Sequence, residues 1–358
     1  MTISTKSRGF GMSRFPQTNY ATPVVFDDGP PPTYVQIVPT GVSYANYAPN
    51  VQDNDGHANR KPFPTDQWLD RHDVTVSHNE EVCSQEIGRA LLAAFGAVES
   101  DQPAAGPSPT VYRHIFTPMD AETSLQLPLY SYFETLGTVE DVAYPSQVCE
   151  SLTIKGDGTG RLTMDRSLRG SGKRISPSGA DWDVNVDLLE NSVDYFYNSQ
   201  ITLVVDDGAP IAYACRYETF TLTITNKIEA DAGYRPGCAT FQEAGVRTSG
   251  MIRQEALFSS RMYDLDFTVR LASGGAEYTA LQQQKNLDIV LTAEGGIIED
   301  ALTHKLTVNI PLGRYQTVSK GDSNGFVTLS VKAKVLYDVE NDEIISVELI
   351  NDVEAYTA

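Results

Sequence analysis

The sequence has few of the residues that most often carry chemistry or cross-links. Its 358 residues include four cysteines, at positions 83, 149, 215 and 238, and only two tryptophans. The cysteines show no CxxC pair and no dense disulfide framework, so we expect reduced thiols. No apolar run approaches the roughly 18–20 residues of a membrane helix, and the first residues lack the apolar core of a signal peptide. We therefore expect a protein made in a cytoplasm, with no membrane partner.

Basic residues are also scarce. The chain has 27 Lys and Arg against 47 Asp and Glu, a formal net charge of −20 at pH 7. Affinity for nucleic acid depends largely on Lys and Arg that neutralise phosphates, so this balance argues against a conventional nucleic-acid-binding protein. Binding to an anionic membrane surface is disfavoured for the same reason. Solubility at high concentration explains the charge equally well.

No motif for catalysis, phosphate binding or metal binding is complete. Gly170–Lys173 (GSGK) lacks the first Gly and the final Ser or Thr of a Walker A loop. Asp53–Gly56 (DNDG) resembles part of a calcium loop but has no closing Glu. His78, Glu81 and Cys83 lie close together, but no fourth metal ligand follows at a suitable spacing. We expect no catalytic residue, cofactor or metal, and hence no enzyme.

Strands with one apolar face are the strongest pattern that is present. Phe220, Leu222 and Ile224 alternate with threonines, and Leu265 and Phe267 alternate with aspartates, as in strands that bury one face. We expect further strands at 73–77, 111–117, 125–136, 150–155, 161–169, 199–205, 211–213, 287–292, 305–310, 326–337 and 344–351. The sequence therefore predicts a mainly β protein.

Two helices are expected among these strands. Ser77 and Glu80 have the spacing of a capping box, an apolar stripe follows from Cys83 to Phe95, and Gly96 suits a C-terminal cap. This pattern predicts a helix over 80–95, which would close the end or side of a barrel. A shorter helix is expected near 277–285.

The order of elements indicates how the chain is divided. Strand–helix–strand occurs at 73–117 and again at 263–292, which suggests a duplication. The expected division is an extended N-terminal arm at 1–65, a first β domain at 66–175, a polar connection at 176–198 and a second β domain at 199–358. The arm is expected to be ordered where it lies on its own domain or on a neighbour.

A group of basic residues stands out in this acidic chain. Arg166, Arg169, Lys173 and Arg174 follow one another at the end of a predicted hairpin. They are candidate subunit-interface residues that would contact an acidic neighbour. A solvated hairpin tip is the alternative interpretation.

Several segments together resemble the tail tube (major tail) proteins of long-tailed bacteriophages. The resemblance covers about residues 70–355, outside the N-terminal arm, and depends on the order of its motifs more than on any one of them. These motifs are the helical segment Glu80–Gly96, YRHIFTP at 112–118, 148–172, FTLTITN at 220–226, GVRTSG at 245–250 and KLTVNIPLGR at 305–314.

The resemblance implies a β-sandwich or barrel with a flanking helix that self-assembles into stacked rings, the conduit for DNA ejection. The extra length suggests two tube-type domains per subunit and a ring of three with pseudo-sixfold symmetry; a ring of six is the alternative. Expected partners are further copies of the chain, a tape measure protein and tail-tip or baseplate proteins. DNA would pass the acidic lumen without specific binding. The location would be the virion tail, after assembly in the bacterial host cytoplasm, with 1–65 and 99–110 as candidate ring-to-ring contacts.

Two other classes of protein stay open. Another β-rich virion protein, such as a decoration, baseplate or adhesin subunit, shares this composition. An enzyme on a β-sandwich that acts on carbohydrate would need paired carboxylates and exposed aromatic side chains. The 18 tyrosines could supply the aromatics, but no carboxylate pair stands out.

Overall fold

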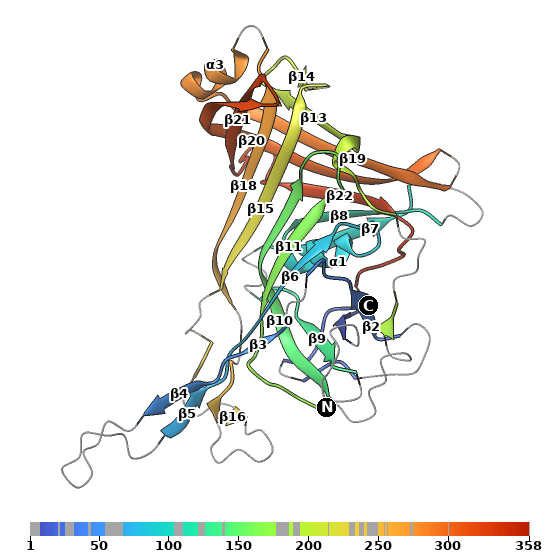
Figure 1. The fold of residues 1–358 in the computed structure, drawn as a ribbon, viewed down its shortest axis with the longest axis vertical. Coiled ribbons are helices and arrows are strands. Elements are labelled where there is room, and N and C mark those ends of the chain that lie inside the picture. Colours follow the sequence, from blue (N-terminus) through green and yellow to red (C-terminus); the bar gives the residue numbers. More distant parts are fainter. Residues whose placement is uncertain are drawn as a thin grey trace, which may run out of the picture.

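Antiparallel pairing between strands far apart in sequence builds most of the molecule (Figure 1). The computed structural model describes residues 8–20, 22–25, 32–41, 44–53, 67–103, 110–120, 126–137, 140–176, 186–188, 194–213, 215–228, 233–235, 240–241, 250–253, 255, 257–272, 275–299 and 301–357. The helices are α1 (Ile87–Phe95), α3 (Ala276–Gln283) and the 3-10 turn η2 (Asn198–Gln200). The strands are β1 (Gly9–Ser13), β2 (Tyr34–Ile37), β3 (Asn46–Tyr47), β4 (Asn50–Asp53), β5 (Gln67–Arg71), β6 (Val74–Glu81), β7 (Gly96–Asp101), β8 (Tyr112–Pro118), β9 (Tyr130–Thr135), β10 (Asp141–Gly156), β11 (Thr163–Arg169), β12 (Val186–Asp187), β13 (Ile201–Asp206), β14 (Ile211–Ala212), β15 (Tyr217–Ile228), β16 (Thr240–Phe241), β17 (Gly250–Met251), β18 (Phe258–Arg270), β19 (Leu287–Glu299), β20 (Leu302–Ser323), β21 (Phe326–Val335) and β22 (Ser346–Asn351).

Two layers of strands meet at β20 and face each other as the two walls of a barrel. The first layer runs β3–β6–β11–β10–β15–β18–β21 and continues into the far half of β20. The second runs β7–β8–β22–β20–β19–β13–β14. Strands of 66–175 pair with strands of 199–358 in both layers, β10 with β15 and β8 with β22. The division into two tube-type domains stays a prediction.

The core lies where the alternating strands turn their apolar faces inward. Phe220, Leu222 and Ile224 on β15 are buried, as are Leu265 and Phe267 on the neighbouring β18. The threonines between them lie on the opposite face, as the period of two requires. The mainly β fold expected from the sequence is confirmed.

A bend in β10 connects the barrel to a smaller sheet in the order β10–β9–β1–β2–β12. The register shifts between Tyr144 and Gln147, where Ser146 has a φ of 60°. β1 is buried along its whole length between β9 and β2. Residues 9–13 of the predicted N-terminal arm therefore lie on the subunit itself, because Phe10 and Met12 are part of the core.

Helix α1 begins later than the sequence predicted and is buried on every side. Ser77 and Glu80 belong to β6, because the backbone of 75–81 pairs with β11 along its length. The helix over 80–95 is thus corrected to Ile87–Phe95, and Gly96 ends it with a φ of 94°. All nine helical residues are buried, with the ring of Tyr356 from the C-terminal segment packed at Gly88. The second helix lies close to its predicted position.

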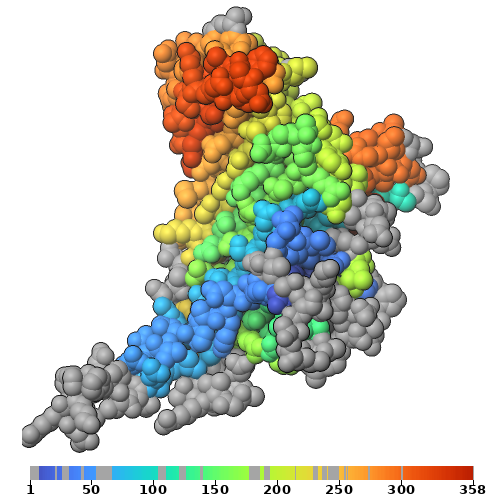
Figure 2. Space-filling view, in the orientation of Figure 1, coloured from blue at the N-terminus to red at the C-terminus, as the bar shows by residue number. Residues whose placement is uncertain are grey.

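A four-stranded sheet of β4, β5, β16 and β17 projects from the barrel (Figures 1 and 2). We call this sheet the projecting arm. β5 leads directly into β6, with only His72 and Asp73 between them. The projecting arm is therefore a continuation of the first layer beyond the core.

Candidate functional site

Arg166 is not a surface residue. Its side chain is 2% exposed, and its Nη2 donates to Glu80 Oε1 at 2.6 Å. On β11 the residues Met164, Arg166 and Leu168 alternate toward the core. The sequence interpretation of Arg166 as an interface residue is corrected, because the period of two places it inside the subunit.

The other three predicted basic residues are also engaged within the subunit or partly buried. Arg169 lies 3.3 Å from a carboxylate oxygen of Asp73 and 3.5 Å from one of Glu150. Arg174 pairs with Glu140. Lys173 is half-buried, and burial lowers the pKa of its ammonium group. The four side chains do not form one exposed patch, and an interface role for Arg169, Lys173 and Arg174 stays a prediction.

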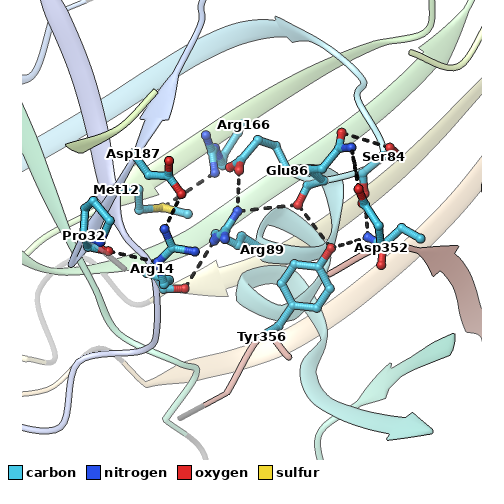
Figure 3. Close-up of polar contacts among 12 residues, drawn as sticks. Met12, Arg14, Pro32, Ser84, Glu86, Arg89, Arg166, Asp187, Asp352 and Tyr356 are labelled. Carbon is cyan, nitrogen blue, oxygen red and sulfur yellow. Dashed lines mark hydrogen bonds and ion pairs between the residues drawn. The ribbon is translucent and has the colours of Figure 1, made fainter. Parts of the chain in front are cut away.

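Arg166 belongs to a buried polar network that joins both ends of the chain to α1 (Figure 3). Arg89 on α1 pairs with Glu86, and its Nε donates to the carbonyl oxygen of Arg14 at 3.2 Å. Tyr356 donates through its hydroxyl to the carbonyl oxygen of Gln85 at 3.1 Å. These hydrogen bonds fix the terminal segments against the helix.

The residues considered for a metal site point in different directions. His78 faces the core, where its Nε2 lies 3.0 Å from Tyr132 Oη, and burial lowers its pKa to about 3. Glu81 faces outward and pairs with Arg161. The thiol of Cys83 is free and buried. Within the described ranges no group of three or more His, Cys, Asp or Glu could hold a metal ion; most of the Asp53–Gly56 loop lies outside them.

The cysteines that the structure describes are free thiols. Cys83 and Cys149 are buried, which raises the pKa of each to about 12, whereas Cys215 is exposed. Cys238 lies outside the described residues.

The projecting arm is held in place by a buried anchor. His72 donates its backbone N–H to the carbonyl oxygen of Met251 at 2.9 Å, and Arg253 donates likewise to Ser171 at 2.9 Å. The guanidinium of fully buried Arg253 lies 3.7 Å from Asp73. Gly172 has a φ of +90°, and a Cβ there would lie 2.3 Å from the carbonyl oxygen of His72. The anchor thus fixes the direction in which the arm leaves the barrel.

The surface of the projecting arm carries exposed apolar side chains. Val51 is 49% exposed and Trp68 is 45% exposed. Trp68 pairs with Gln52 across the hairpin, while Val51 pairs with Leu69. A projection with exposed apolar side chains is suited to contact with another protein. The structure describes part of each segment that was predicted to make ring-to-ring contacts. β4 belongs to the segment 1–65, and β7 occupies the start of the segment 99–110. Residues 104–109 lie outside the described part.

The outer faces of both layers carry charged side chains that meet across strands. On the first layer, cross-strand ion pairs such as Lys155–Asp165 and Lys334–Asp264 stand among threonines. On the second layer, Asp206 lies directly opposite Asp288. The pKa of Asp288 is raised by burial first and then by the neighbouring Asp206. Like charges also meet on the first layer, where burial first and then the neighbouring Asp264 raise the pKa of Asp266 on β18.

Comparison with known proteins complements this geometry. A family model described as phage tail tube protein matches residues 24–333. No curated protein sequence matches the chain. Among the described helices, none is long and apolar enough to cross a membrane.

Proposed function

Because the chain belongs to the phage tail tube protein family, it is a structural protein of a phage tail, and we propose that it self-assembles into stacked rings that form the conduit for DNA ejection. The observation that carries this proposal is the family match over residues 24–333, which spans the projecting arm and most of both layers of the barrel.

The charge of the subunit supports the proposed passage of DNA. A net charge of −20 on each copy gives an assembled tube a strongly negative field, which repels phosphate. DNA then passes through the lumen without specific binding. The role is structural rather than catalytic.

The proposed partners are further copies of the same chain, a tape measure protein and tail-tip or baseplate proteins. Two tube-type domains per subunit would give rings of three with pseudo-sixfold symmetry, and rings of six are the alternative. Assembly takes place in the host cytoplasm before the tail joins the virion. The position of the projecting arm at one end of the molecule (Figure 1) supports a role for it in contacts between rings.

Negative-stain electron microscopy of the purified protein, with light scattering for mass, tests the proposal. We expect rings or hollow filaments, and the ring mass divided by 39.2 kDa gives the number of subunits. A control sample receives purified tail tips as initiator, since tube subunits can wait for one. A protein that stays monomeric even on tail tips would overturn the tube and favour another virion role.

A further inference from the structure

An extended segment covers the outer edge of β6. We call residues 38–41 and 44–47 the strap. The backbone N–H of Thr40 donates to the carbonyl oxygen of Asn79 at 2.7 Å. Further along, Asn46 pairs with Thr75 and Tyr47 with Val74. The strap therefore hides an edge of the first layer that would otherwise offer free backbone groups.

The strap is weakly held compared with the strand on the other side of β6. β11 pairs with β6 continuously from Thr75 to Glu81. The strap instead contributes a two-residue strand, an isolated bridge at Pro39 and the Thr40 hydrogen bond. None of its described residues is buried, and Val38 is 48% exposed. A segment with little apolar burial and few backbone bonds opens at a low free-energy cost.

A few side-chain contacts keep the strap in place. The Tyr47 hydroxyl lies 2.7 Å from His72 Nδ1, at the anchor of the projecting arm. The guanidinium of Arg8 lies 4.3 Å from the centre of the Tyr44 ring. The Ala45 backbone N–H donates to Glu134 at 3.4 Å. Two of these contacts reach buried residues, His72 and Glu134, and Ala45 and Tyr47 pack against the border of the core. The contacts are few, and the pairing of β6 with β11 does not depend on them.

The opposite end of the same layer is an open edge. β20 residues 314–323 pair with β21 on one side. α3 packs beside this stretch: Gln284 Nε2 donates to the Tyr315 carbonyl oxygen at 3.4 Å, and Lys320 Nζ lies 5.8 Å from the centre of the Tyr278 ring. No strand among the described residues pairs with the other side of 316–323, and most of its side chains are exposed. From 316 to 323 there are eight residues, and β6 also has eight.

We propose that the strap is a removable cover, and that the β6 edge beneath it accepts the open β20 edge of a second copy of this chain. The first layer thus ends in two different edges, one covered and one open, and each is eight residues long. A heterologous contact between copies joins two different surfaces of this kind. Such a contact closes into a ring if the rotation between copies closes. In the free subunit the strap prevents premature edge-to-edge pairing. The inference rests on the proposed tube function and deepens it by naming the side-to-side interface.

A reversible lock on the strap tests this inference. The double substitution Asn46→Cys and Thr75→Cys places two thiols at directly opposite positions of an antiparallel pair, a separation that a disulfide can span. The background carries Cys215→Ser and Cys238→Ser, and thiol titration verifies the bond. We expect the oxidised protein to form at least about tenfold fewer rings than the background, with full recovery after dithiothreitol.

A matched lock inside the barrel is the control. Thr202→Cys with Thr292→Cys joins β13 to β19 at another directly opposite pair and leaves the strap free. This variant should assemble equally well when oxidised and when reduced. Rings formed by the oxidised strap lock at the background level would overturn the inference while leaving the tube function intact. A background protein that forms no rings, even on tail tips, would overturn the tube function itself.

Discussion

The guanidinium of Arg166 and the carboxylate of Glu80 lie 2.6 Å apart in the core, so each buried charge depends on the other. Breaking such a pair leaves one charge without compensation, which typically costs about 3–5 kcal/mol. We therefore expect Arg166→Met to lower the free energy of unfolding by about that amount, measured by urea denaturation followed by circular dichroism.

The double variant Arg166→Met with Glu80→Met is the control for this prediction. It removes both charges, so it should regain most of the lost stability. If the single variant is as stable as the wild type, the pair is not the buried ion pair that the geometry describes.

Glu134 makes the stability of the subunit depend on pH. The residue is 5% exposed, and burial raises the pKa of its carboxyl group to about 7, while the backbone N–H of Ala45 and the charge of Arg8 act in the opposite direction. Between its ordinary value of 4.5 and about 7 the folded state holds a proton that the unfolded state has released. Stability should therefore fall as pH rises through this window.

The variant Glu134→Gln removes this titration. We expect it to be more stable than the wild type by about 2 kcal/mol at a pH of about 8, and equally stable at a pH of about 4. Urea midpoints across the pH range measure the difference. Parallel profiles for the two proteins would show that Glu134 titrates normally.

At the scale of elements, α1 is positioned by the C-terminal segment. Gly88 lies under the ring of Tyr356, and a Cβ at this position would be 2.1 Å from Tyr356 Cζ. In an exposed helix Gly→Ala stabilises by about 1 kcal/mol, but overpacking a buried site costs about 1–3 kcal/mol. Because of the clash with Tyr356, the net effect of Gly88→Ala on stability is expected to be destabilising.

We expect Gly88→Ala to lower the thermal midpoint and the unfolding free energy, measured by calorimetry and urea denaturation. Combining it with Tyr356→Ala relieves the clash, so the two effects should be non-additive. Strict additivity would mean that the ring moves aside freely.

Strands whose apolar residues alternate were predictable from the sequence, whereas some strands without that pattern were missed. β15 and β18 have a clear period of two and were predicted correctly. β1 was missed because Gly9 and Gly11 leave only two apolar side chains, Phe10 and Met12, to show a pattern. The start of α1 was misplaced because Ser77 and Glu80 fit a capping box equally well, and only pairing with the distant β11 decides for a strand.

The candidate site was less predictable than the fold. The anchor brings His72 and Asp73 together with Ser171 and Arg253, which are far apart in sequence and carry no shared local pattern. A signal for Arg166 was available, since Met164 and Leu168 flank it at alternate positions. Charge alone suggested a surface residue, whereas the strand period indicated the core.

At the scale of the whole molecule, the net charge of −20 opposes association between copies. The Debye length falls from about 14 Å at about 50 mM salt to about 6 Å at about 300 mM, so added salt screens this repulsion. We expect the protein concentration needed for ring assembly to fall several-fold over that range, measured by light scattering. Sucrose at matched osmolality is the control and should have little effect.

The same samples address the proposed indifference to DNA. A labelled DNA duplex should show no binding in fluorescence anisotropy at the lowest salt, where any attraction to phosphate is strongest. Binding there would contradict a repulsive lumen.

The 22-residue strand β20 belongs to both layers of the barrel. It pairs with β19 and β22 along its near half and with β21 along its far half. A pull on the β20–β21 hairpin along the strand axis therefore strains many backbone bonds at once, in shear, instead of opening them one after another. Tension that neighbouring copies exert there is passed to both layers together, so the subunit resists stretching as a single mechanical body.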